Sequence, residues 1–178
     1  SFLIIVALLL LIEMLDRTLR DAGRTKRVTG YKVVGAVPSL SASRYGGLTK
    51  TYVQHSASEL TNSLLRFLDK RKSPGVFIIN LFSINEDSDE ETIGNLVCGY
   101  MQSRMLNTRF ITHGVDFNTN STQYLLAKNI TDFYTLQGED ILIVAYPPLS
   151  ESSIPSALLH DVNANILIAS ANHGWKTF

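Results

Sequence analysis

Apolar residues in this chain form two kinds of segment that alternate along the sequence. Three short segments are continuously apolar, as expected for strands buried on both faces of a sheet: residues 76–81, 141–144 and 166–169. Between them, apolar residues recur at helical spacing near residues 92–105, 122–133 and 152–160. Strands that alternate with helices predict an α/β fold with a doubly wound, mostly parallel sheet.

The chain begins inside an apolar run that covers residues 2–12. Eleven helical residues rise only about 16 Å, whereas a bilayer core is roughly 30 Å thick. A buried core helix and the core of a signal peptide are therefore alternatives. Basic residues follow the run rather than precede it, as on the cytoplasmic side of a membrane helix: Arg17, Arg20, Arg24, Lys26 and Arg27. The pattern predicts that residues 1–14 are the end of a transmembrane helix.

Two further segments follow this predicted membrane helix. Residues 15–55 are interpreted as a basic juxtamembrane helix and a linker, because residues 39–55 are rich in Ser, Gly and Thr and have no apolar period. A capping box at Ser56 to Glu59 then predicts the start of a helix. Its apolar face would hold Leu60, Leu64, Phe67 and Leu68. An α/β domain is expected over residues 56–178, cut short at its carboxyl end.

The composition limits the possible classes of function but does not indicate an activity. The length of 178 residues suits one α/β domain, and the formal net charge of zero gives no reason to expect nucleic acid as a partner. Cys98 is the single cysteine, so the sequence contains neither a disulfide framework nor a cysteine-based metal site.

An acidic loop occupies the place where a phosphate-binding loop would stand, between the strand at 76–81 and the helix that follows. A phosphate loop needs glycines and a Lys there. This chain instead has Asn85, Glu86, Asp87, Ser88, Asp89, Glu90 and Glu91. A carboxylate about 5 Å from a phosphate charge repels it by roughly 3 kcal/mol, against about 8 kcal/mol for micromolar affinity. We therefore expect a degenerate loop that binds no nucleotide.

The same acids have two other interpretations. Ser88 to Glu91 matches a capping box, which would place the carboxylates at the positive end of the helix. Asp87 and Asp89, with Asp116 at the end of the predicted strand segment 109–116, are weak metal-ligand candidates. The spacing fails as an EF-hand, because Thr92 and Cys98 stand where the Gly and the Glu are needed. We predict no metal site, and Asp116 is more simply a loop or cap residue.

A third segment, residues 140–148, resembles the Walker B strand of nucleotide-binding α/β proteins. Such a strand ends in a carboxylate that holds the metal, whereas this one ends at Ala145 and two prolines. The acidic position on the neighbouring strand is reduced to His113 or Asp116. Both usual anchors for magnesium and phosphate are therefore missing.

The order and spacing of these segments resemble the cytoplasmic kinase-like domain of bacterial tyrosine kinases joined to Wzz-type chain-length determinants, the polysaccharide co-polymerases. The resemblance runs through residues 15–20, 34–38, 59–67, 140–148 and 171–176. It implies a P-loop-like fold and an oligomerisation helix whose interface would include Glu59 and Arg66. Asn62 and Leu65 stand where that helix is expected to carry arginines.

The resemblance also implies a function. The chain would be the cytoplasmic, pseudokinase-like domain of a bacterial inner-membrane regulator of exopolysaccharide, capsule or lipopolysaccharide chain length. Its expected partners are copies of itself, polysaccharide polymerase and export proteins, and a separate active tyrosine kinase. No catalytic residue and no cofactor are predicted.

Two alternatives stay open. A tyrosine kinase or ATPase could use a rearranged site that binds ATP and magnesium, with Arg104, Arg109 or Lys128 as its basic residue. An unrelated Rossmann-like domain could bind a small ligand at the strand ends, although the chain has no G-x-G-x-x-G sequence.

Overall fold

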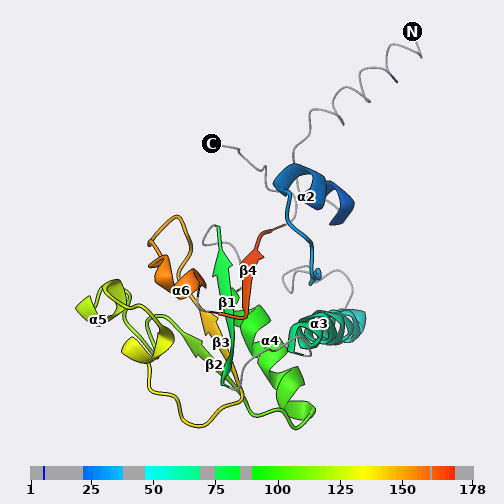
Figure 1. Cartoon of the computed structure of the whole chain (residues 1–178). Helices are drawn as coiled ribbons and strands as arrows, with labels where there is room; N and C mark the ends of the chain where they lie inside the picture. Colours follow the sequence, from blue (N-terminus) through cyan, green and yellow to red (C-terminus); the bar gives the residue numbers. More distant parts are fainter. Residues whose placement is uncertain are drawn as a thin grey trace. The chain divides into compact units, whose positions relative to one another are not determined.

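The computed structural model describes residue 6 and residues 22–37, 47–68, 75–84, 90–160 and 162–170. The chain divides into two compact units, Val34–Ile168 and a second made of Ser1–Val33 with Ala169–Phe178 (Figure 1). Within the second unit, α2 (Ala22–Thr29) carries Lys26 and Arg27 in its last turn. The predicted membrane segment lies outside the described residues apart from Val6. No helix in the described ranges is long and apolar enough to cross a membrane.

A four-stranded sheet forms the centre of the larger unit. Its strands are β1 (Phe77–Ser83), β2 (Thr108–Thr112), β3 (Ile141–Ala145) and β4 (Ala164–Ile168). They lie in the order β2-β3-β1-β4, and all three pairings are parallel. The predicted α/β class with a doubly wound, mostly parallel sheet is confirmed, and the arrangement is consistent with a P-loop-like fold.

Helices cover both faces of this sheet (Figure 1). On one face, α4 (Glu90–Ser103) packs on β1, β2 and β3, and α3 (Gly47–Leu68) packs on α4. The other face carries the short helices α5 (Thr122–Leu125), η2 (Ile130–Asp132) and α6 (Ala157–His160). The connection from β1 to β2 therefore passes over one face, and the connection from β3 to β4 passes over the other.

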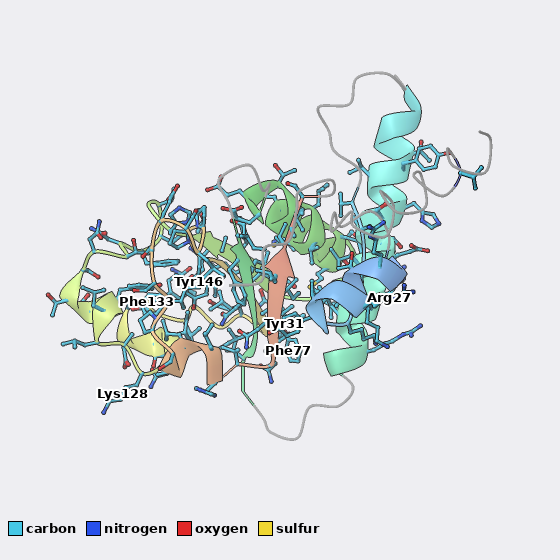
Figure 2. The ribbon with its side chains drawn as sticks, turned by 90° about the horizontal axis from the view of Figure 1, so that it is seen from above. Arg27, Tyr31, Phe77, Lys128, Phe133 and Tyr146 are labelled. Atoms are coloured by element: carbon cyan, nitrogen blue, oxygen red, sulfur yellow. The ribbon has the colours of Figure 1, made fainter. Side chains whose placement is uncertain are left out.

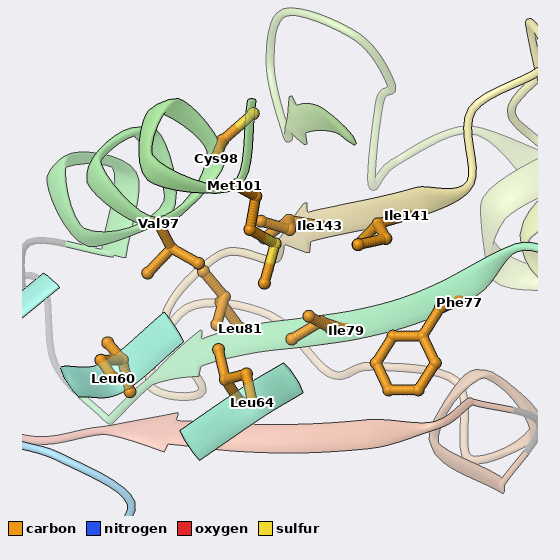
Figure 3. Packing of buried hydrophobic residues seen from close by; sticks show 10 residues of the cluster. All are labelled: Leu60, Leu64, Phe77, Ile79, Leu81, Val97, Cys98, Met101, Ile141 and Ile143. Carbon is orange, nitrogen blue, oxygen red and sulfur yellow. The ribbon is translucent and has the colours of Figure 1, made fainter. Parts of the chain in front are cut away.

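The core has two halves because successive strand residues point to opposite faces. Figure 3 shows the half beneath α3 and α4, which contains Leu60, Leu64, Phe77, Ile79, Leu81, Val97, Cys98, Met101, Ile141 and Ile143. The other half is aromatic. It includes Phe133 and Tyr146, which are labelled in Figure 2. The centroids of these two rings lie 5.0 Å and 5.9 Å, respectively, from that of Phe117.

The start of α3 corrects the sequence prediction. The helix begins at Gly47 rather than Ser56, so residues 47–55 of the predicted linker are helical and the capping box lies inside the helix. Val53 and Ala57 are buried two turns and one turn before Leu60, respectively, which extends the apolar stripe of the helix. Ser58 does not cap a helix; its hydroxyl donates to the Tyr100 hydroxyl on α4, with 2.8 Å between the oxygens.

Two other predicted helices are much shorter than expected. The region 122–133 contains only α5 and η2, and the region 152–160 is helical only over Ala157–His160. Local hydrogen bonds replace the helix between α5 and η2, where the Asp132 carboxylate accepts the backbone N–H groups of Lys128 (2.7 Å) and Asn129 (3.1 Å). These bonds, with the Lys128 N–H first, lower the pKa of Asp132.

The contact between α4 and β2 gives a test of this packing. A Cβ built on Gly94 would lie 2.2 Å from Cε2 of Phe110, whereas a Cβ on Gly99 would meet nothing within 4 Å. We expect Gly94→Ala to lower the free energy of unfolding by about 1–3 kcal/mol, because the ring must move. Gly99→Ala, the matched control, should raise it by about 0.5–1 kcal/mol through helix propensity.

Urea unfolding followed by circular dichroism measures both variants. Equal stability of the two would contradict the close approach of α4 to Phe110.

Candidate functional site at the carboxyl ends of the strands

The carboxyl ends of β1 and β3 are the place where an open α/β sheet most often binds a ligand. These strands are neighbours, and the connections that leave them pass over opposite faces, which makes this point a topological switch. Leu81 pairs with Ala145, and Ala145 pairs with Thr112, so three strands end close to the same level. A nucleotide would be expected in the crevice beyond these residues.

The segment that follows β3 runs across the carboxyl end of β1. Ala145 is fully buried, and Pro147 and Pro148 after it are buried as well. The Tyr146 N–H donates to the Leu81 carbonyl (3.0 Å), and the Leu149 N–H donates to the Ser83 carbonyl (2.9 Å). The segment after β3 is therefore hydrogen-bonded along the end of β1.

Ala145 stands where a Walker B strand would carry its carboxylate. A methyl group offers no oxygen to a metal ion. The next residue, Tyr146, points to the aromatic half of the core, where its hydroxyl is buried. Burial raises the pKa of Tyr146, and the nearby Tyr124 adds to the effect. This phenol is not placed to act as a phosphoryl acceptor.

The acidic loop is described only at its end. Asn85, Glu86, Asp87, Ser88 and Asp89 lie outside the described residues, so the predicted capping box and the ligand role of Asp87 and Asp89 stay predictions. Glu90 and Glu91 form the first turn of α4, where the helix dipole favours carboxylates. The Thr112 hydroxyl donates to Glu91 Oε1 at 3.0 Å, which joins α4 to the end of β2.

Glu90 differs from its exposed neighbour. Its side chain is 7% exposed, and Oε2 has no hydrogen-bond partner within the described part of the chain. The hydroxyl of Ser83, at the end of β1, is likewise buried and unpartnered there. Both residues flank residues 85–89, which lie outside the described residues.

Asp116 caps the end of β2. Its Oδ2 accepts the Thr112 N–H at 2.9 Å, and its own N–H donates to the Thr112 carbonyl at 3.0 Å. Gly114 permits this turn with a φ of 78°. The His113 N–H continues the ladder to the Ala145 carbonyl at 3.2 Å. The carboxylate that the sequence singled out on this strand is thus bound to the protein's own backbone.

No cluster of three or more His, Cys, Asp or Glu side chains suited to a metal ion occurs among the residues the structure describes. The contact between Glu91 and Thr112 was not expected from the sequence. The two residues lie 21 positions apart on different elements, so no local pattern reports it.

Glu59 and Arg66, the predicted interface residues, both lie exposed on α3. Glu59 Oε1 is 3.8 Å from Nδ1 of His55, one turn earlier in the helix. Glu59 and Arg66 belong to one exposed stripe of this helix, which we call the α3 stripe. It contains, at alternating spacings of three and four residues, Tyr52, His55, Glu59, Asn62 and Arg66.

No protein-family model matches this chain, and no curated protein matches it. Among solved structures, the crystal structure of the chimerical protein CapA2B2 is similar at a TM-score of 0.46 with 12% sequence identity. The similarity covers 74% of this chain and 77% of that chain.

Removing the Asp116 carboxylate tests its role as a cap. We expect Asp116→Ala to lower the midpoint of thermal unfolding by roughly 2–4 °C, because the Thr112 N–H loses its charged acceptor. Asp140→Ala is the control, since it removes the same charge from an exposed position just before β3. Calorimetry measures both midpoints, and a larger fall for Asp140→Ala would refute the assignment.

Proposed function

We propose that this chain is the non-catalytic, kinase-like cytoplasmic domain of an inner-membrane polysaccharide co-polymerase. It would act in assembly and partner binding, and so take part in setting polysaccharide chain length. Support comes from the order of sequence motifs and from the P-loop-like parallel sheet. The observation that carries the proposal is at the end of β3, where buried Ala145 replaces a metal-binding carboxylate and the following backbone is hydrogen-bonded to β1.

The charged residues at the carboxyl ends of the strands argue against phosphoryl transfer. Glu91 and Asp116 are acidic and bind the hydroxyl and the N–H of Thr112, respectively. Unscreened carboxylates beside a phosphate oppose its binding. Transfer would instead need a metal ion and a cation beside the transferred group.

Two of the three basic residues of the enzyme alternative, Arg104 and Arg109, are hydrogen-bonded elsewhere. Arg104 follows the carboxyl end of α4, where its guanidinium donates to the Tyr100 hydroxyl at 2.8 Å. Arg109, near the amino end of β2, donates to Gln137 Oε1. To bind a nucleotide at the carboxyl ends of the strands, either arginine would have to break its present hydrogen bond. Its side chain would also have to reach the opposite edge of the sheet.

The α3 stripe is the surface we assign to self-assembly. It presents a tyrosine, an acid–histidine pair, an amide and a guanidinium, a polar mixture with one aromatic residue. Arg and Tyr are enriched in protein interfaces, so the stripe has suitable groups for contact with a second copy.

Nucleotide binding is the first test. We expect calorimetric titration of magnesium-ATP into the full chain in mild detergent to give no binding heat up to millimolar nucleotide. A micromolar Kd would overturn the non-catalytic proposal. If binding were found, its loss in Arg109→Gln but not in Lys128→Gln would place the nucleotide beside Arg109 and favour the rearranged enzyme.

Crosslinking tests assembly separately. In a Cys98→Ala background, we expect Asn62→Cys, in the middle of the α3 stripe, to give crosslinked dimers with a short bis-maleimide. Ser150→Cys, an exposed control after β3, should give few. Equal yields from the two positions would refute self-assembly through α3, whatever the nucleotide result.

A further inference from the structure

A polar pocket lies at the amino ends of β2 and β3, at the edge of the sheet opposite the candidate site. Its volume is about 640 Å³, within the usual range for small-molecule sites. The walls come from α4, from the start of β2 and from the segment before β3. They are formed by Asn95, Cys98, Gly99, Gln102, Asn107, Thr108, Arg109, Phe110, Gln137 and Glu139.

Two residues of α4 shape the wall next to β2. Gly99 has no side chain, and a Cβ there would meet only open space. Figure 3 shows Cys98 on α4 at the margin of the core, away from Leu60 and Leu64. Its Sγ donates weakly to the Thr108 carbonyl at 3.7 Å, and burial raises the pKa of this thiol. The Cys98 side chain is therefore a neutral part of the wall.

Two polar side chains in this wall are buried without being satisfied. Glu139 is 6% exposed; its Oε2 accepts the Gln137 N–H at 2.6 Å, but Oε1 has no partner among the described residues. Thr108 is 4% exposed, and its hydroxyl is also unpartnered there. Buried polar groups are normally hydrogen-bonded, so this pair indicates a missing partner. A carboxylate oxygen accepts, so the partner must include a donor.

The charges of the pocket balance. Glu139 supplies one negative charge and Arg109 one positive charge, and the Arg109 guanidinium is held by Gln137 and lies 5.9 Å from the Tyr134 ring centre. An anion would face the Glu139 carboxylate, and a cation would face Arg109. The balance favours a neutral ligand over either charged class.

The amides of the wall offer both donors and acceptors. Gln102 donates through Nε2 to the Thr108 carbonyl at 2.9 Å, which leaves its oxygen as an acceptor. Asn107 donates through Nδ2 to the Gly138 carbonyl at 2.8 Å and likewise keeps its oxygen. Gln137 accepts from Arg109 and keeps its NH₂ as a donor. Because a hydroxyl group both donates and accepts, a ligand with several hydroxyls matches such a wall.

An extended peptide fits less well. β2 is an edge strand of the described sheet, and its outward groups belong to Thr108, Phe110 and Thr112. The Thr108 carbonyl already accepts from Gln102, and the Thr112 N–H already binds Asp116. Phe110 alone keeps a free N–H and carbonyl for an added strand, which is too little for strand addition.

We propose that this pocket binds a neutral polyhydroxylated ligand, a sugar unit of one or two rings. The unpartnered Glu139 and Thr108 oxygens are closed to water in this conformation, so these two side chains would turn toward the pocket to bind ligand hydroxyls. Gly99 would leave room for the ring. The pocket is separate from the carboxyl ends of the strands, so this site does not depend on whether nucleotide binds there.

The test uses the full chain and three neutral probes: glucose, N-acetylglucosamine and cellobiose. Glucuronate and glucosamine are the charged comparisons. Saturation-transfer difference NMR with titration gives the dissociation constants. We expect saturable binding of at least one neutral sugar, with weaker binding of its charged analogue. No saturable signal from any neutral sugar, or tighter binding of glucuronate, would overturn the proposal.

Two variants with matched controls locate the site. Glu139→Gln removes the charged acceptor and should raise the dissociation constant about tenfold. Glu151→Gln makes the same change on an exposed turn and should leave it unchanged. Gly99→Leu fills the open space and should abolish binding, whereas Ser103→Leu, on the same helix outside the pocket, should not.

The Gly99 variant also covers a failure of Glu139→Gln to fold, because its added side chain enters open space and Leu favours helix. Far-ultraviolet circular dichroism checks the fold of every variant. Sugar binding that survives in a folded Gly99→Leu protein would refute the assignment to this pocket.

Discussion

The pairing of β1 with β3 is the constraint on which the rest of this structure depends. The five pairs from Phe77–Ile141 to Leu81–Ala145 stand at the centre of the sheet, and every residue of β3 is buried. A parallel pair buried on both faces must be covered by other elements on both sides. α4 with α3 supplies one cover, and the aromatic cluster around Phe117 and Tyr146 supplies the other. The first candidate site lies at the carboxyl ends of this pair, and the pocket lies at the amino ends of β3 and of its other neighbour, β2.

The carboxyl and amino ends of the strands differ in how their polar groups are hydrogen-bonded. At the carboxyl ends, the hydroxyl and the N–H of Thr112 donate to the carboxylates of Glu91 and Asp116, respectively. Backbone N–H groups after β3 donate to carbonyls at the end of β1. At the amino ends, Glu139 and Thr108 are buried with polar atoms that lack partners among the described residues. Open α/β sheets usually bind ligands at the carboxyl ends. Among the described residues, buried polar atoms without a partner occur at both edges, at Ser83, Glu90 and His113 as well as at Glu139 and Thr108. At the amino ends, the residues that carry them line a pocket of about 640 Å³.

The sequence predicted the elements whose burial produces a recognisable local run of apolar residues. Short apolar runs located β1, β3 and β4 to within two residues, and β3 was expected to end at Ala145. Sequence-based prediction failed where contacts between distant segments determine the structure. The polar start of α3 is helical because Val53 and Ala57 are buried. No helix continues from α5 to η2 because the Asp132 carboxylate accepts the N–H groups of Lys128 and Asn129. The Glu91–Thr112 bond and the pocket at the amino ends combine residues far apart in the chain, so no local pattern contains them.

Ala145 explains how such a fold can persist without phosphate chemistry. A carboxylate there would have to be held by a metal ion, because an isolated buried charge is costly. A methyl group needs no ion, and Ala145 keeps its ladder places opposite Leu81 and Thr112. The sheet is then stabilised by its hydrogen-bonded ladders and by packing, without a bound ion. On the proposed function, selection acts on the surfaces of the domain. On this argument we propose that function resides at the outward stripe of α3 and in the pocket beside Glu139 rather than at the carboxyl ends of the strands.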